Sequence, residues 1–139
     1  MIVLDSNVIS ELMLDRPNRV VTHWLDRQPY LSIWTTSITV FEIRFGLNSM
    51  PPGNRQTQRI AAFERILTEV IEDRFAPFDS LAAERAAEHA AQRERIGRPG
   101  ELRDTMIAGI VLSSRATLAT RNVKHFDDIA RSVVNPWEA

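Results

Sequence analysis

The chain has no cysteine among its 139 residues. Disulfide bonds and thiolate metal sites are therefore excluded, and a reducing compartment such as the cytoplasm suits the protein. It also has no apolar run near the roughly 18 residues that a membrane span needs. Its opening segment, MIVLDSNVIS, lacks the basic and the long apolar regions of a signal peptide. From these absences we expect a cytoplasmic protein with no membrane association.

An excess of charge of either sign is also missing. The 17 basic and 18 acidic residues leave a net charge of −1, so no overall field draws the protein to nucleic acid. Any contact with nucleic acid must then use local patches. The chain contains no G-x-S-x-G, no P-loop and no G-x-G-x-x-G motif, which removes the main signals for a serine hydrolase, an NTPase or a dinucleotide-binding enzyme.

What the chain does contain is an alternation of short strands and helices. No composition shift, repeat or low-complexity tract divides it, so we expect a single domain over residues 1–139. The expected strands cover residues 2–4, 30–36, 74–77, 116–120 and 131–135. The expected helices cover residues 6–14, 17–28, 38–47, 55–71, 80–97 and 102–114, with a turn or one helical turn at 121–126. This order predicts an α/β fold with a mainly parallel sheet.

Several residues mark where the helices are expected to begin. Ser6, Ser37 and Asp79 each precede a helical pattern and are predicted as N-caps. Pro17 fits the first turn of the second helix, because proline is tolerated at that position.

Asp5 ends the first predicted strand. In open α/β sheets, ligands bind at the carboxyl ends of the strands, so a residue at this position is a candidate for the functional site. An ordinary helix cap or turn explains an aspartate at this place equally well when Asp5 is considered alone.

Two further acids lie on helix faces that are expected to pack inward. Glu42 is three or four positions from Ile38, Thr39, Phe45 and Gly46. A buried, unpaired carboxylate is unfavourable, so it would need a cation, unless the side chain reaches solvent or pairs with an arginine such as Arg44.

Asp104 repeats this pattern in the helix at 102–114. Its neighbours toward the C-terminus are Ile107, Ala108 and Val111, although an aspartate in a first turn is also favoured by the helix dipole. If Asp5, Glu42 and Asp104 converge, their mutual repulsion requires a hard divalent cation. Oxygen ligands favour Mg²⁺ or Mn²⁺ over zinc.

Four segments, in order along the chain, carry a resemblance to a known family. They are IVLDSNVISEL, SITVFEIRFGL, RDTMIAGIVLSSRATLATRNVKHF and the terminal VVNPW. The sequence resembles PIN-domain ribonucleases, and specifically the VapC toxins of bacterial toxin–antitoxin pairs, including the FitB-like branch. The resemblance implies a three-layer α/β/α fold and hydrolysis of RNA phosphodiester bonds with Mg²⁺ or Mn²⁺. It also implies a homodimer and a cognate antitoxin, often a DNA-binding protein, that blocks the site and gives the complex affinity for operator DNA.

The resemblance also assigns roles to residues. It places the family's acidic metal ligands on Asp5, Glu42 and Asp104, and its hydroxyl beside the first acid on Ser6. The fourth position, often an aspartate in the family, is Asn122, which can orient water but carries no charge. We therefore expect one well-formed metal site. A further position where the family often has an acid is occupied by His125.

Arg121 and Lys124 lie beside Asn122 in the sequence and are candidate phosphate contacts, although ordinary surface charges would look the same.

Two alternatives to a metal-dependent ribonuclease stay open at the level of the sequence. One is a small-molecule phosphohydrolase with Asp5 as the nucleophile. It is suggested by the similarity of DSNVI to the D-x-D-x-[TV] loop of haloacid-dehalogenase-type phosphatases, from which it departs at Asn7. The other is a non-catalytic PIN-like binding or regulatory module, suggested by the missing acid at Asn122.

Overall fold

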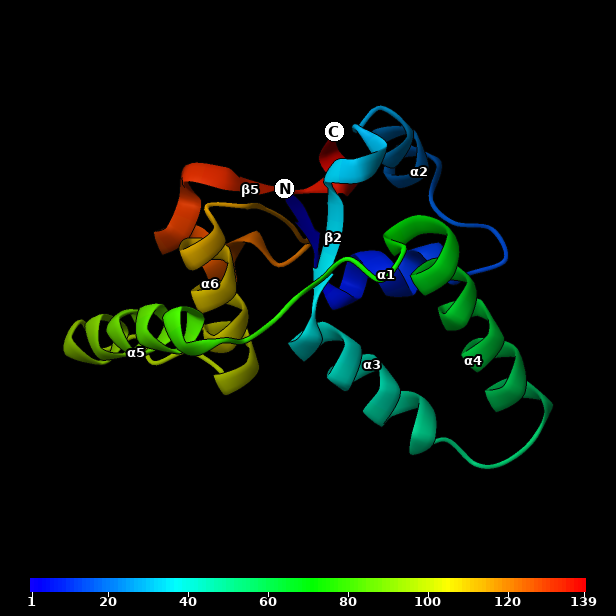
Figure 1. Ribbon diagram of the computed structural model, residues 1–139, viewed down its shortest axis with the longest axis horizontal. Coiled ribbons are helices and arrows are strands. Elements are labelled where there is room, and N and C mark those ends of the chain that lie inside the picture. Colours follow the sequence, from blue (N-terminus) through cyan, green and yellow to red (C-terminus); the bar gives the residue numbers. More distant parts are fainter.

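The sheet forms the centre of the protein, with helices on both of its faces (Figure 1). The computed structural model describes the backbone of residues 1–139 and the side chains of residues 1–129 and 133–139. The strands are β1 (Ile2–Leu4), β2 (Ile33–Thr36), β3 (Phe75–Ala76), β4 (Thr117–Ala119) and β5 (Val133–Val134). They lie in the order β3-β2-β1-β4-β5, and every pair is parallel. The expected parallel α/β sheet is confirmed.

Neighbouring residues of the central strands face opposite layers, because side chains alternate along a strand. Leu4 and Ala119 point into one hydrophobic core, and Val3 and Leu118 point into another. Both faces of the sheet are therefore buried, as a parallel sheet requires, and the expected three-layer α/β/α arrangement is confirmed.

The first layer contains α1 (Ser6–Leu12), α2 (Arg19–Asp26) and α4 (Asn54–Ile66), with α3 (Ser37–Asn48) leading from β2 toward α4 (Figure 1). A π-helical turn, η2 (Leu67–Ile71), continues α4 and completes the helix expected at 55–71. Buried Val8, Val21 and Phe63 are among the side chains that join these helices to the sheet.

The second layer contains α5 (Ser80–Arg95), α6 (Leu102–Ser114) and the 3₁₀ helix η3 (Val123–Ser132). Helices α5 and α6 cross at Gly109, where an added Cβ would lie only 2.4 Å from the carbonyl oxygen of Ala82. Glycine at this position is therefore what lets the two helices approach so closely. No helix in the described part of the chain has both the length and the apolar character needed to cross a membrane.

Two predicted helix caps are wrong by one residue. The cap of α1 is Asp5 rather than Ser6, and the cap of α3 is Thr36 rather than Ser37. Asp5 and Thr36 keep the extended backbone of the strands that they end, which is the conformation that an N-cap needs. Helix α3 therefore begins directly where β2 stops, and only the cap residue Asp5 lies between β1 and α1.

Other predicted boundaries also shift. Helix α2 begins after Pro17, because the side chain of Asn18 caps it. Residues Tyr30–Ser32 form a 3₁₀ turn rather than part of β2. The helical turn expected at 121–126 is the longer helix η3. The cap at Asp79 is confirmed, since its carboxylate accepts a hydrogen bond from the backbone N–H of Ala82.

Candidate functional site

The predicted site residues come from one edge of the sheet, where the carboxyl ends of β1 and β4 lie side by side. Asp5 follows β1 and Thr120 follows β4. Glu42 comes from α3, and Asp104 comes from the first turn of α6. The site is thus assembled from four elements that are distant in the sequence.

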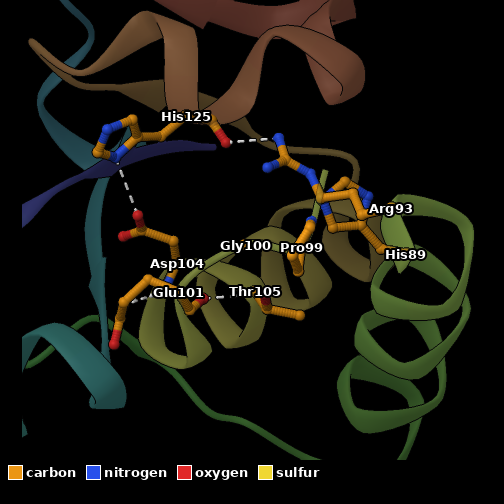
Figure 2. A pocket seen from close by; sticks show the side chains of 8 residues that line it. All are labelled: His89, Arg93, Pro99, Gly100, Glu101, Asp104, Thr105 and His125. Atoms are coloured by element: carbon orange, nitrogen blue, oxygen red, sulfur yellow. Dashed lines mark hydrogen bonds and ion pairs between the residues drawn. The ribbon is translucent and has the colours of Figure 1, made fainter. Parts of the chain in front are cut away.

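Asp104 faces the segment η3 across the site (Figure 2). Its Oδ2 lies 3.0 Å from Nδ1 of His125. The neighbours Ile107 and Ala108 on its face of α6 are buried, as the sequence pattern predicted. Glu101 caps α6 by accepting hydrogen bonds from the backbone N–H groups of Arg103 and Asp104.

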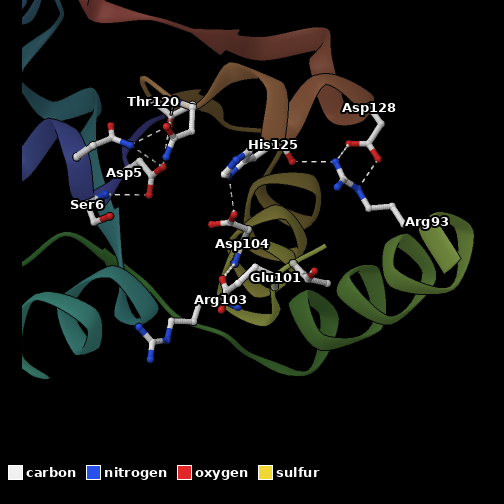
Figure 3. Close-up of polar contacts among 12 residues, drawn as sticks. Asp5, Ser6, Arg93, Glu101, Arg103, Asp104, Thr120, His125 and Asp128 are labelled. Carbon is white, nitrogen blue, oxygen red and sulfur yellow. Dashed lines mark hydrogen bonds and ion pairs between the residues drawn. The ribbon is translucent and has the colours of Figure 1, made fainter. Parts of the chain in front are cut away.

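Asp5 is the most enclosed carboxylate of the site, with an exposed fraction of 4% (Figure 3). Its Oδ1 accepts a hydrogen bond of 2.8 Å from the backbone N–H of Ser6. Its Oδ2 accepts one of 2.7 Å from the hydroxyl of Thr120 and a longer one from the amide of Asn7. Both oxygens are therefore fixed by neighbours on α1 and by the residue that follows β4.

Glu42 is partly buried on α3, and its Oε2 lies 4.0 Å from Nη1 of Arg103. The expectation that its whole helix face packs inward is only partly met, because Phe45 is exposed while Thr39 is buried. The suggested pairing with Arg44 does not form, since Arg44 pairs with Glu64.

The electrostatics of these carboxylates show that they lie in one another's field. Burial raises the pKa of Glu42 to about 6, with further contributions from the charges of Asp5, Asp104 and Glu101, while Arg103 opposes the shift. Burial also raises the pKa of Asp5, and the charge of Asp104 adds to this shift against the hydrogen bonds from Thr120, Ser6 and Asn7. Repulsion of this kind is what a bound cation relieves.

The donor chemistry of Asp5, Glu42 and Asp104, which is oxygen only, fits a hard divalent cation. Among the described side chains, those of residues 1–129 and 133–139, no three carboxylate or histidine groups are arranged to hold a metal ion. The carboxylate of Asp104 is bonded to His125, and that of Glu42 lies near Arg103.

The remaining predicted residues lie on the segment that follows β4. Asn122 is exposed, and its backbone N–H donates to the hydroxyl of Thr120. Arg121 is also exposed, and its guanidinium lies over the ring of Trp137 at 4.9 Å from the ring centroid. Lys124 is exposed on η3. Ser6 contributes its backbone N–H to Asp5.

Three contributors to the site were not predicted from the sequence. Thr120 is fully buried and binds Asp5, while Asn7 links the ends of β1 and β4 through bonds to Asp5, Thr120 and the backbone of Arg121. Arg103 is the cation nearest to Glu42. One signal in the sequence could have identified Thr120. It comes directly after a buried strand, and that strand lies beside the strand that Asp5 follows.

A partly buried ion pair between α5 and η3 supports η3. Arg93 of α5 donates to both carboxylate oxygens of Asp128, each over 2.7 Å, and to the backbone carbonyl of His125 over 2.8 Å (Figure 3). This hydrogen bonding lowers the pKa of Asp128. Arg93 thus fixes the backbone of the residue whose side chain binds Asp104.

Comparison with known proteins finds the same fold and close sequence relatives. The PIN domain family matches residues 2–132. The chain is 37% identical over 138 residues to the VapC ribonuclease Y4jK of Sinorhizobium fredii, and 31% identical over 137 residues to the toxin FitB of Neisseria gonorrhoeae, with 99% of each chain covered in both cases. The structure of FitAB bound to the IR36 DNA fragment has a TM-score of 0.87 and 31% identity, covering 99% of this chain and 96% of that one.

Proposed function

The chain belongs to the PIN domain family, and on that premise we propose that it is a VapC-type ribonuclease toxin. It hydrolyses phosphodiester bonds in RNA and is inhibited by a cognate antitoxin. The observation that carries this proposal is the group of three carboxylates, Asp5, Glu42 and Asp104, at the carboxyl edge of the sheet: the charge of Asp104 contributes to the raised pKa of Asp5, and the charges of both contribute to the raised pKa of Glu42. Residues 1–139 form a single PIN domain in this proposal.

Mg²⁺ or Mn²⁺ is the proposed cofactor, held by Asp5, Glu42 and Asp104. When bound, the ion supplies positive charge against the scissile phosphate and lowers the pKa of the attacking water. The missing acid at Asn122 supports a single well-formed metal site, with the amide of Asn122 orienting water or substrate.

The protein's own groups have separate tasks in this mechanism. Thr120, Asn7 and the backbone of Ser6 keep the carboxylate of Asp5 in one orientation. One carboxylate of this group accepts the proton of the attacking water at an oxygen atom. Lys124 and Arg121, which are exposed beside Asn122, are candidate contacts for the phosphates of the RNA.

The proposed partners follow from the relatives and from the surface. FitAB is a relative whose structure contains DNA, which supports a DNA-binding antitoxin that brings the complex to its operator. The stacked, exposed rings of Phe41 and Phe45 form an apolar surface on α3 that supports a homodimer. Cytoplasmic location without membrane association is part of the same proposal.

Cleavage of RNA by the purified protein tests the proposal directly. With Mg²⁺ or Mn²⁺ and total RNA, the wild type should give discrete new 5′ ends, and EDTA should abolish them. Asp5→Asn and Asp104→Asn should lower the cleavage rate by more than about a hundredfold, because charge stabilisation by a metal is worth several kcal/mol. Asp26→Asn, the same change at an exposed position of α2, is the control and should cut like the wild type.

Full activity in the Asp5→Asn variant would exclude the assignment of Asp5. A non-catalytic module is the alternative, favoured by Asn122 and by the lack, among the described side chains, of three acidic or histidine groups arranged to hold a metal ion. It gives a different result. The wild type would then bind its antitoxin but show neither RNA cleavage nor metal binding by calorimetry.

A further inference from the structure

A cavity of about 240 Å³ lies beside Asp104 and is not used by the proposed mechanism. Its walls are formed by Arg93 and His89 of α5, Gly100 of the preceding loop, Thr105 of α6 and His125 of η3 (Figure 2). Figure 3 shows Asp104 between Asp5 on one side and Arg93 on the other. A group in the cavity would therefore adjoin the proposed catalytic carboxylates without lying among them.

The charges around the cavity disfavour a phosphate. The guanidinium of Arg93 is compensated by its two bonds to Asp128. Burial lowers the pKa of His89, which favours its neutral form. Two acidic residues, Glu101 and Asp104, also line the cavity. An anion would thus meet no net positive charge, whereas a neutral polar group would meet no opposing field.

A hydrogen-bond donor and an acceptor lie next to each other on the wall. Nη1 of Arg93 and Oγ1 of Thr105 are each 3.3 Å from the place that a Cβ on Gly100 would take. The bonds of Arg93 to Asp128 and His125 use Nε and Nη2, so Nη1 is the nitrogen on the Gly100 side. Thr105 donates to the carbonyl of Glu101, and its oxygen keeps capacity to accept.

The size and the mouth of the cavity suit a flat ring. Its volume is below the roughly 300–1,000 Å³ of pockets that enclose a whole small-molecule ligand. The side chain of His125 is 58% exposed, so a face of its ring is available. Single-stranded RNA is commonly recognised by unstacked bases that lie against aromatic or histidine rings and offer their edges for hydrogen bonding.

We propose that this cavity binds one nucleobase of the RNA substrate, from a nucleotide adjacent to the bond that is cut. The base lies against His125 and directs its edge to Nη1 of Arg93 and Oγ1 of Thr105, while the phosphate stays at the carboxylates. The inference rests on the proposed function, since it takes RNA as the substrate. Its consequence is a base preference at one position beside the cleavage site.

Abasic substitution tests this proposal. An oligoribonucleotide that spans a mapped cut is prepared with one abasic nucleotide at each position near the cut in turn. For the wild type, kcat/KM should fall by about fivefold or more at a single position, which is the lower end of what one stacked base contributes.

Gly100→Val fills the cavity between Arg93 and Thr105, and the backbone of Gly100 lies outside the left-handed region that only glycine favours. In this variant the intact RNA should be cut as slowly as the abasic RNA is cut by the wild type, and the abasic substitution should have no further effect. Ala91→Leu adds the same number of carbon atoms at an exposed position of α5 and should behave as the wild type does.

Equal abasic penalties in the wild type and in a folded Gly100→Val variant would overturn the nucleobase site, and so would the lack of a penalty at any position. Thermal unfolding reports whether the variant folds, and Gly100→Ala, with a smaller expected effect, replaces it if it does not. These results differ from failure of the proposed function, in which the wild type cuts no RNA at all.

Discussion

The two sides of the site are held in different ways. On one side, Asp5 is enclosed by the ends of two central strands, and its oxygens are bonded to Ser6, Thr120 and Asn7. On the other side, Asp104 is 28% exposed and is bonded to His125 on a 3₁₀ helix. Sheet topology alone places the first carboxylate, while the second depends on a segment that the Arg93–Asp128 pair secures.

This difference indicates on which side of the site a substitution disturbs less of the structure. A change near Asp5 disturbs the central strands of the sheet, because Asp5 also donates its backbone N–H to Ala119. A change at the polar residues of η3 disturbs a segment outside the sheet and its ion pair between Arg93 and Asp128. Asn122 and His125, the two positions where the resemblance predicts a departure from the family's acids, both lie on that side.

Removal of the Arg93 side chain should give the largest effect on stability. Arg93→Met leaves Asp128 without its partner. Loss of one partner from a buried pair costs 3–5 kcal/mol, and Asp128 is a quarter exposed, so we expect about 3 kcal/mol of unfolding free energy. Urea unfolding measures this change. Arg85→Met, which breaks the exposed pair with Glu88, is the matched control and should change the stability by less than about 1 kcal/mol.

A smaller effect is expected from Thr120→Val on the opposite side. The variant keeps the shape of the side chain but removes the hydrogen bond to Asp5, whose pKa then rises further. We expect a loss of about 2 kcal/mol from a less satisfied buried carboxylate, and a ten- to hundredfold slower cleavage because Asp5 is less well oriented. Thr57→Val, at an exposed position of α4, serves as the control. A loss of stability greater than that of Arg93→Met would reverse the comparison of the two sides.

The smallest effect concerns Glu42, whose carboxylate lies in the field of both Asp5 and Asp104. Its pKa is raised from 4.5 to about 6, so the folded protein binds more protons than the unfolded chain between these pH values. The stability of the metal-free protein should therefore fall as the pH rises through this range, by about 1–2 kcal/mol from this group.

Glu42→Gln should remove that part of the pH dependence, and a saturating divalent cation should remove it in the wild type. Urea unfolding in EDTA at several pH values between 4 and 8 measures it. Glu84→Gln, on the exposed surface of α5, is the control. Identical pH profiles for Glu42→Gln and the wild type would show that Glu42 ionises as an exposed glutamate does.

Much of the architecture was predictable because it follows from local patterns. The strand-and-helix alternation predicted the parallel sheet, and the buried neighbours of Asp104 confirmed the reading of its helix face. The prediction that the helix face of Glu42 packs inward was only partly right, because Phe45 is exposed on the surface that we propose for the dimer. A single sequence does not distinguish an apolar residue in a core from one at an interface.

Contacts between distant segments were not predictable from the sequence. Arg93 and Asp128 are separated by 35 positions and belong to no motif. For α1 the sequence allowed both Asp5 and Ser6 as the cap, because aspartate and serine are about equally favoured, and for α3 it predicted Ser37 instead of Thr36, because serine is the more favoured cap. In both cases tertiary structure decides between two adjacent residues that can each cap a helix.

The position of β1 in the middle of the sheet has a consequence for synthesis of the protein. β1 contains residues near the N-terminus, but its partner β4 ends at Ala119, and the bond between Asp5 and Thr120 spans 115 positions. Domains fold as the chain leaves the ribosome from its N-terminus. The Asp5 side of the site therefore cannot form until residue 120 has emerged, 115 positions after Asp5 itself.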